Sequence, residues 1–429
     1  MSRATTSPSA TRIDRRTALG ALATLAAGAC APRTPIPPPS FDTAAERYVR
    51  AALQLAQHDP RLVDGWSGPA DWRPGPRVPV AGLVAELEAL ALEVADLRVA
   101  GGDDARRGRY LAGQVQALHL AGRRLLGDSA PLADEAQRAY GRTMPAVDAP
   151  LVIGALDALN ERLPGSGALG PRAQAFRRQM IVPADRVEAV ARAAFEACRD
   201  RTRAAMTLPE GEAATLAFVQ GTTWDAWCRY DGGLRSTIEV NQAGEATVSR
   251  LCWLMAHEAY PGHHVQHVVI DHALVQGRGW QELALQPAFG PHLLMAEGAA
   301  EWGVERVLPD PEREVLYADV LLPAAGLSPD LALDIVALER LSLDLEMAVV
   351  SLAADYLDGK ANAETTIDLL TRESVVADPR AFVHFAEQQR TRLYAYPVGR
   401  QLVLERLGAP AAPGTWARLQ TFYEQGLVP

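Results

Sequence analysis

Three histidines and a glutamate stand within eight residues in the segment HEAYPGHH, residues 257–264. Six of the nine histidines of the chain fall between positions 257 and 292. In zinc hydrolases with the pattern H-E-x-x-H, two imidazoles one helical turn apart bind the metal, and the glutamate activates a metal-bound water molecule. Such polar groups inside an otherwise apolar helix would be costly without a cation. The segment therefore predicts a metal site with His257 as a ligand and Glu258 as general base.

The second imidazole ligand does not occupy the usual position. One turn after His257 the chain has Pro261, which cannot bind a metal and cannot continue a regular helix. We expect a kink or bulge at Pro261 and Gly262. A two-residue bulge would bring His263 into the place of the missing ligand. On an undistorted helix, His264 would instead face the same way as His257, about 10 Å further along the axis. We predict His263 as the ligand, with His264 as the alternative.

A third ligand is available in the later segment MAEGAAEWGVE, residues 295–305. Glu297 is the predicted carboxylate ligand, and Glu301, one turn on, is expected to orient a ligand imidazole. Two imidazoles and a carboxylate suit Zn²⁺ and leave a fourth position open for water.

The motif HEAYPGHHVQ resembles the HE-x-x-PGHH-[LV]-Q signature of the DUF885 family, bacterial proteins that are often lipoproteins and are grouped with gluzincin-like metallopeptidases. Glu297 and Gly298 stand where that family has EGW, and the segments RLSLD (340–344) and AYPVG (395–399) are similar to its RLVVD and SYKIG. The resemblance covers residues 45–410. It departs at Ala299, where the family has the tryptophan of EGW, and at Ala348, where it has a histidine; these departures affect the substrate pocket more than the metal ligands.

The resemblance implies a zinc metallopeptidase that cleaves peptide or related amide bonds. Within that expectation, the strand-like segment STIEVN (236–241) would hold an extended peptide by main-chain pairing. Tyr396 could donate its hydroxyl to a developing oxyanion, and Arg400 could bind a substrate carboxylate. The alternative function is a catalytically inactive, metal-containing binding or scaffold lipoprotein of the cell envelope.

The elements that must position these groups are mostly helical. Apolar residues recur at helical spacing through the first half of the chain, for example from Leu83 to Leu97. Strand patterns are confined to residues 215–219 and 236–241, which predicts a small sheet beside the metal-binding helix. Asn362 and the pair Asp378-Pro379 are predicted to begin later helices. The expected fold is mainly α, with gluzincin-like architecture, an N-terminal helical region at 41–205 and a metal-site region at 206–429.

The first forty residues have the features of an export signal. Arg15 and Arg16 precede an uncharged run of small and apolar residues (17–29), which has a twin-arginine character. The residues before Cys30 resemble a bacterial lipobox. We predict a signal peptide at 1–30, a lipid anchor at Cys30 and a proline-rich tether at 31–40. The mature protein is expected on the periplasmic side of the cell envelope.

Charge and cysteine content narrow the partners. The formal net charge of −10 argues against nucleic acid, because neutralising phosphates requires a basic face. Four cysteines without a C-x-x-C pattern imply neither a disulfide framework nor a cysteine zinc site. A peptide or small amide is the expected substrate, and membrane contact is expected only through the lipid anchor.

Overall fold

The computed structural model describes residues 40–97, 101–222 and 224–428. Ser40–Pro429 form one compact unit. The predicted signal peptide and lipid-anchor residue Cys30, with all but the last residue of the predicted tether, lie outside the described residues. None of the described helices is both long and apolar enough to cross a membrane.

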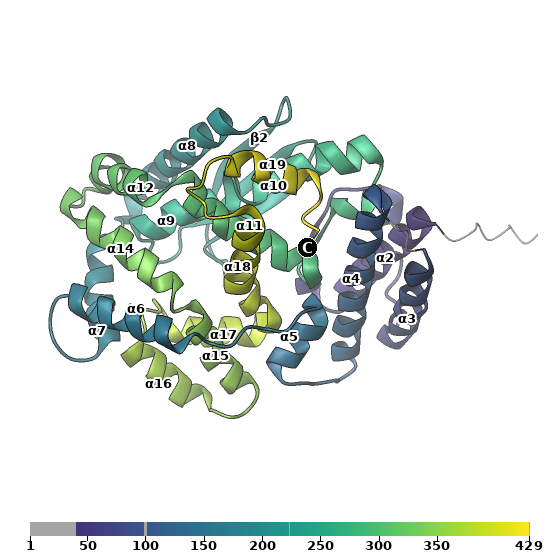
Figure 1. Cartoon of the computed structure of the whole chain (residues 1–429), viewed down its shortest axis with the longest axis horizontal. Helices are drawn as coiled ribbons and strands as arrows, with labels where there is room; N and C mark the ends of the chain where they lie inside the picture. Colours follow the sequence, from purple (N-terminus) through teal and green to yellow (C-terminus); the bar gives the residue numbers. More distant parts are fainter. Residues whose placement is uncertain (1–39, 98–100, 223, 429) are drawn as a thin grey trace, which may run out of the picture. The chain divides into compact units, whose positions relative to one another are not determined.

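Helices dominate this unit, which confirms the mainly α prediction (Figure 1). The α-helices are α2 (Phe41–Ala56), α3 (Val80–Asp96), α4 (Gly102–Leu125), α5 (Leu132–Tyr140), α6 (Ala149–Arg162), α7 (Leu169–Arg177), α8 (Val187–Ala205), α9 (Val248–Leu254), α10 (His263–Ile270), α11 (Gly290–Val307), α12 (Asp310–Leu316), α13 (Leu322–Ala325), α14 (Ala332–Leu343), α15 (Glu346–Leu357), α16 (Ala363–Glu373), α17 (Pro379–Gln389), α18 (Ala395–Leu407) and α19 (Thr415–Glu424). Short 3-10 helices are η1 (Pro60–Leu62), η2 (Ala70–Trp72), η3 (Arg178–Met180), η4 (Ala184–Arg186), η7 (Gln281–Ala284), η9 (Pro329–Leu331) and η10 (Arg390–Tyr394). Three π-helical segments are η5 (Met255–Ala259), η6 (Asp271–Gln276) and η8 (Tyr317–Leu321).

Local sequence explains where several helices begin and which face they bury. Side-chain oxygens of Asn362 and Asp378 accept hydrogen bonds from the backbone N–H three residues on, at the starts of α16 and α17. Both predicted N-caps are therefore confirmed. In α3, the residues at helical spacing from Leu83 to Val94 are buried, as their period predicts.

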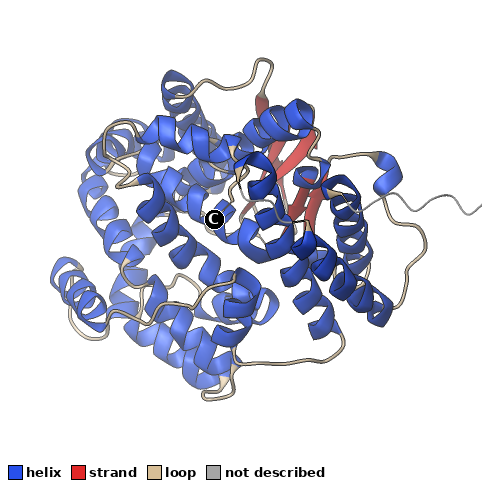
Figure 2. Ribbon diagram, turned by 45° about the vertical axis from the view of Figure 1, so that its right-hand side comes forward, coloured by secondary structure: helices blue, strands red, loops and turns tan. Residues whose placement is uncertain are grey.

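Two small sheets carry the strands, drawn in red in Figure 2. The first pairs β1 (Val63–Trp66) antiparallel with β5 (Leu285–Pro287). The second has the order β2-β4-β3, from β2 (Ala213–Val219), β4 (Arg235–Asn241) and β3 (Ala226–Gly232). Here β2 runs parallel and β3 antiparallel to the central β4. This sheet contacts the metal-binding segment through β3 and η5, as predicted for a small sheet next to that helix.

The segment predicted to bind a metal, residues 257–264, is distorted as Pro261 requires. Helix α9 passes into the π-helix η5, regular structure stops at residues 260–262, and α10 starts at His263. A Cβ atom at Gly262 would lie 1.7 Å from the carbonyl oxygen of His257, so only glycine fits where the chain folds back on η5. The predicted kink is confirmed, although the distortion already starts at Met255 with wider π turns.

Helices α11 and α18 lie side by side (Figure 1). A Cβ at Gly298 would lie 2.1 Å from the carbonyl carbon of Gly399, and a Cβ at Gly399 would lie 2.2 Å from the carbonyl oxygen of Leu294. Two glycines thus let these backbones approach more closely than any side chain would allow. This contact determines how residues on one helix face residues on the other.

Candidate metal centre

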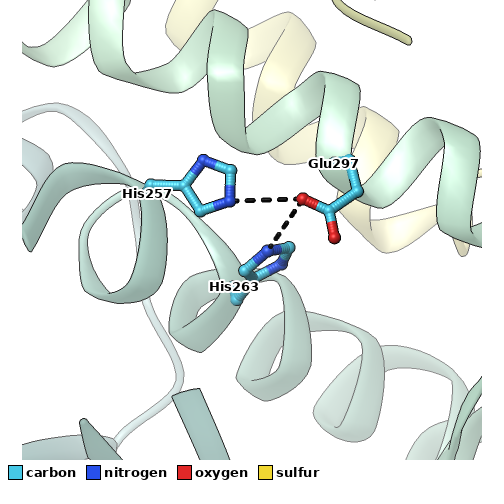
Figure 3. Close-up of side chains that lie close together, drawn as sticks. All are labelled: His257, His263 and Glu297. Carbon is cyan, nitrogen blue, oxygen red and sulfur yellow. Dashed lines mark ion pairs between the residues drawn. The ribbon is translucent and has the colours of Figure 1, made fainter. Parts of the chain in front are cut away.

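Two imidazoles and one carboxylate converge where η5, α10 and α11 meet (Figure 3). Nε2 of His257 lies 3.3 Å, and Nε2 of His263 lies 3.6 Å, from the same oxygen, Oε2 of Glu297. One potential ligand atom from each residue lies within 4.8 Å of the other two. His257 and Glu297 are buried, and His263 is half-buried. The group could hold a metal ion.

The unpaired atoms of this group also suit a cation. Within the described part of the chain, the buried Oε2 of Glu297 has no hydrogen-bond partner. Burial lowers the pKa of His263, but the carboxylates of Glu297 and Glu258 raise it more, to about 9. Burial lowers the pKa of His257 to about 4, so this imidazole is neutral at pH 7. A divalent cation would replace the proton that His263 holds among carboxylates, and two imidazoles with one carboxylate are a donor set that suits zinc.

Neighbouring side chains lie against both imidazoles. Nδ1 of His257 lies 3.4 Å from Oε1 of Glu301, and the Trp253 indole, which stacks on the His257 ring, donates from Nε1 to Oε2 of Glu301. Nδ1 of His263 lies 3.2 Å from the amide oxygen of Gln266. In each ring this leaves Nε2 to face Glu297, as expected for a metal-binding imidazole. Nδ1 of His257 has no hydrogen-bond partner among the described residues, so Glu301 lies near this imidazole and its orienting role stays a prediction.

The alternative ligand His264 lies in a different cluster. Its Nε2 is 2.8 Å from Oε2 of Glu212, and its Nδ1 is 2.8 Å from Oγ of Ser236. The Tyr260 hydroxyl donates to the same Glu212 oxygen, and Arg203 pairs with the other one at 2.6 Å. Both ring nitrogens of His264 are thus engaged away from Glu297. Because of the break at residues 260–262, the side chains of the adjacent residues His263 and His264 lie in different clusters.

Glu258 is buried and held by the sheet. Its Oε2 accepts a hydrogen bond of 3.0 Å from the backbone N–H of Cys228 in β3. Burial raises the pKa of Glu258 to about 7. A carboxyl group with this pKa can accept and return a proton near neutral pH.

The two remaining predicted residues are Tyr396, which lies beside the cluster, and Arg400, which pairs with a carboxylate outside it. The Tyr396 ring centroid lies 6.4 Å from that of His257, beside the cluster. Nε of Arg400 is 2.5 Å from Oε1 of Glu305, two turns along α11 from Glu297. Glu305 thus pairs with one nitrogen of the Arg400 guanidinium group, and the binding of a substrate carboxylate by Arg400 stays a prediction.

Arg392 is the residue at the cluster that the sequence did not reveal. Its Nη2 atom donates a hydrogen bond to Oε1 of Glu297 at 2.7 Å. One pattern in the sequence was available as a signal. Arg392, Tyr396 and Arg400 follow one another at intervals of four residues, and Glu297 and Glu305 are eight residues apart.

The strand predicted to hold substrate is not at an edge of its sheet. Residues 236–241 belong to β4, the central strand, whose main-chain groups pair with β2 on one side and β3 on the other. An incoming peptide cannot pair with it. The edge strand beside Glu258 is β3.

The first prediction separates the two adjacent histidines. His257→Ala and His263→Ala should each lose stoichiometric metal, whereas His264→Ala should keep it. Loss of His264 instead leaves Glu212 with one partner fewer, so this variant should be less stable by about 1–3 kcal/mol. Elemental analysis after zinc reconstitution, with thermal unfolding of each variant, measures both effects. Metal loss in His264→Ala with retention in His263→Ala would reverse the assignment.

Comparisons with known proteins identify no family. No protein-family model matches the chain, and no curated protein is significantly similar to it. Among solved structures, a candidate lipoprotein from Colwellia psychrerythraea shares 15% identity with a TM-score of 0.47, over 91% of this chain and 77% of that chain. A candidate lipoprotein of unknown function from Shewanella oneidensis shares 14% with a TM-score of 0.44, over 82% and 71%. Metallocarboxypeptidase 1 from Trypanosoma cruzi shares 10% with a TM-score of 0.30, over 90% and 89%. The resemblance to DUF885 remains a prediction from motifs.

Proposed function

We propose that this protein is a zinc-dependent hydrolase of peptide or related amide bonds, with Glu258 as general base. The convergence of His257, His263 and Glu297 on one point beside a buried glutamate carries this proposal. A binding or scaffold protein would need the three ligands but would not need the carboxylate of Glu258.

Each remaining group has a role that follows from its chemistry. Zinc, when bound by the three ligands, would polarise the scissile carbonyl and lower the pKa of water toward about 7. Glu258 would take a proton from the attacking water and pass it to the leaving amine. Burial raises the pKa of Tyr396 well above its usual value, so its hydroxyl stays protonated and can donate to a developing oxyanion.

The substrate backbone would lie along β3. This strand is at the edge of its sheet, and the N–H of Cys228 points to Glu258 rather than to β4. Pairing with β3 would place an extended peptide next to the general base.

Export and lipid anchoring at Cys30 belong to the same proposal. The arginine pair, the short uncharged run and the proline-rich tether support a location on the periplasmic side of the envelope.

The second prediction tests the hydrolase directly. Purified protein with one equivalent of zinc should cleave members of a peptide library, removal of the metal with a chelator should abolish cleavage, and added Zn²⁺ should restore it. Mass spectrometry of the products gives the bond cleaved. If zinc-loaded protein cleaves nothing in the library, the binding or scaffold function replaces this proposal. Cleavage that persists without metal would also contradict it.

A further inference from the structure

Two ion pairs join α11 to the segment that contains η10 and α18. Arg392, in the middle of η10, pairs with Glu297, and Arg400 in α18 pairs with Glu305. Both pairs therefore hold η10 and α18 against α11. The backbones of the two helices also approach each other closely at Gly298 and Gly399.

Arg392 divides the two oxygens of the Glu297 carboxylate. Its Nη2 atom donates a hydrogen bond to Oε1 at 2.7 Å, while Oε2 faces the Nε2 atoms of His257 and His263. Its Nη1 atom lies 3.7 Å from Oδ2 of Asp64 in β1. The side chain of Glu297 is 2% exposed, so water does not compete for Oε1.

The backbone around Arg392 is held from both sides. Arg390 has φ +45° and ψ −109°, a conformation rare for residues other than glycine. Its guanidinium group donates twice to Oε2 of Glu135, at 3.0 and 2.7 Å, and the Tyr140 hydroxyl donates to the carbonyl oxygen of Thr391 at 2.9 Å. A strained conformation kept in place by several contacts is typical of functional sites. Here it fixes the direction in which Arg392 leaves η10.

We propose that Arg392 is a positioning residue of the metal centre: it holds Oε1 of Glu297 and so leaves Oε2 as the only oxygen that can bind the metal. A carboxylate that binds through one oxygen leaves a coordination position for water, whereas binding through both would fill it. This inference rests on the proposed metal site but not on hydrolysis.

The experiment measures metal binding alone, with Co²⁺ as a coloured substitute for zinc. Arg392→Gln should weaken Co²⁺ binding about 10- to 100-fold in a chelator competition. It should also lower the visible absorption of bound Co²⁺, since a second oxygen of Glu297 would raise the coordination number and higher-coordinate Co²⁺ absorbs more weakly. Arg400→Gln is the matched control: it removes the same kind of pair eight residues along and should change neither quantity. An equal effect of both variants on affinity, or an unchanged affinity and spectrum in Arg392→Gln, would overturn the proposal.

Arg392→Lys provides the same test if the glutamine variant does not fold. A lysine keeps the charge but presents one ammonium group in place of a planar fork, so we expect Co²⁺ affinity below that of the wild type. Wild-type affinity and spectrum in this variant would reject a requirement for the guanidinium group. Loss of catalysis in other experiments would not affect these readouts, so failure of the hydrolase proposal and failure of this one are distinguishable.

Discussion

Glu258→Gln should lower the rate of peptide hydrolysis by about 100- to 10,000-fold while zinc stoichiometry stays at one. Glutamine has the shape of glutamate and retains a side-chain oxygen that can accept from the Cys228 N–H, but it cannot take up the proton of the attacking water. Glu258 is not one of the three candidate metal ligands, so metal content should not change. Turnover of a peptide identified by library digestion, with metal analysis of the same sample, measures both.

Glu305→Gln is a suitable control for this experiment. It also neutralises one carboxylate, but Glu305 pairs with Arg400 and is not among the three converging ligands. Its activity should remain close to that of the wild type. Equal activity of Glu258→Gln and wild type would show that another group takes the proton.

The pH profile gives the same assignment a second readout. The base form of Glu258 is required, so activity should fall as pH decreases through its pKa. Burial places that pKa at about 7, and a bound dication would lower it, so the acid limb should lie at or below pH 7. In Glu258→Gln, the residual activity should lack this limb.

Gly298→Ala should destabilise the protein by about 3 kcal/mol and weaken zinc binding at the same time. The new methyl group would meet the backbone of Gly399 at 2.1 Å, and backbone cannot move aside as a side chain can. The helices α11 and α18 must therefore separate, and Glu297, the preceding residue, moves with α11. Chemical denaturation with and without zinc, together with the zinc dissociation constant, measures the two effects.

Gly154→Ala controls for the general effect of replacing a helical glycine. Gly154 lies inside α6, where an added Cβ would have no neighbour within 4 Å. This variant should be more stable by about 0.5–1 kcal/mol, without change in zinc affinity. A Gly298→Ala protein as stable as wild type would show that the two helices do not need their close approach.

The sequence predicts those features whose causes are local. Proline at position 261 forbids a regular helix, so the kink follows directly from it. Polar caps such as Asn362 mark helix starts because their side chains satisfy free backbone N–H groups nearby. The wide turn of η5 has no comparable signal, since a π-helix depends on packing around Met255–Ala259 rather than on any one residue. The sequence favoured His263 over His264 from the expected bulge alone, and the structure places His263, not His264, beside Glu297.

Some features that depend on distant pairing were not predicted. Strand β3 has a short alternation of buried and exposed residues from Cys228 to Asp231, too brief to stand out. Arg392 meets Glu297 only because two glycines bring α18 against α11, a contact between segments that are far apart in the chain. The pairing of Arg400 with Glu305 was missed for the same reason, because Glu305 comes from the other helix.

The chemical reactivity of the three thiols in the described part of the chain would report on local unfolding of the protein. Cys198 in α8, Cys228 in β3 and Cys252 in α9 are unpaired and buried. Burial raises the pKa of each thiol, so the reactive thiolate is scarce in the closed protein. A small alkylating reagent can therefore reach each cysteine only during local or global unfolding. Modification rates at the three positions would show whether helix α8, the edge of the sheet and the helix before the histidines open separately or together.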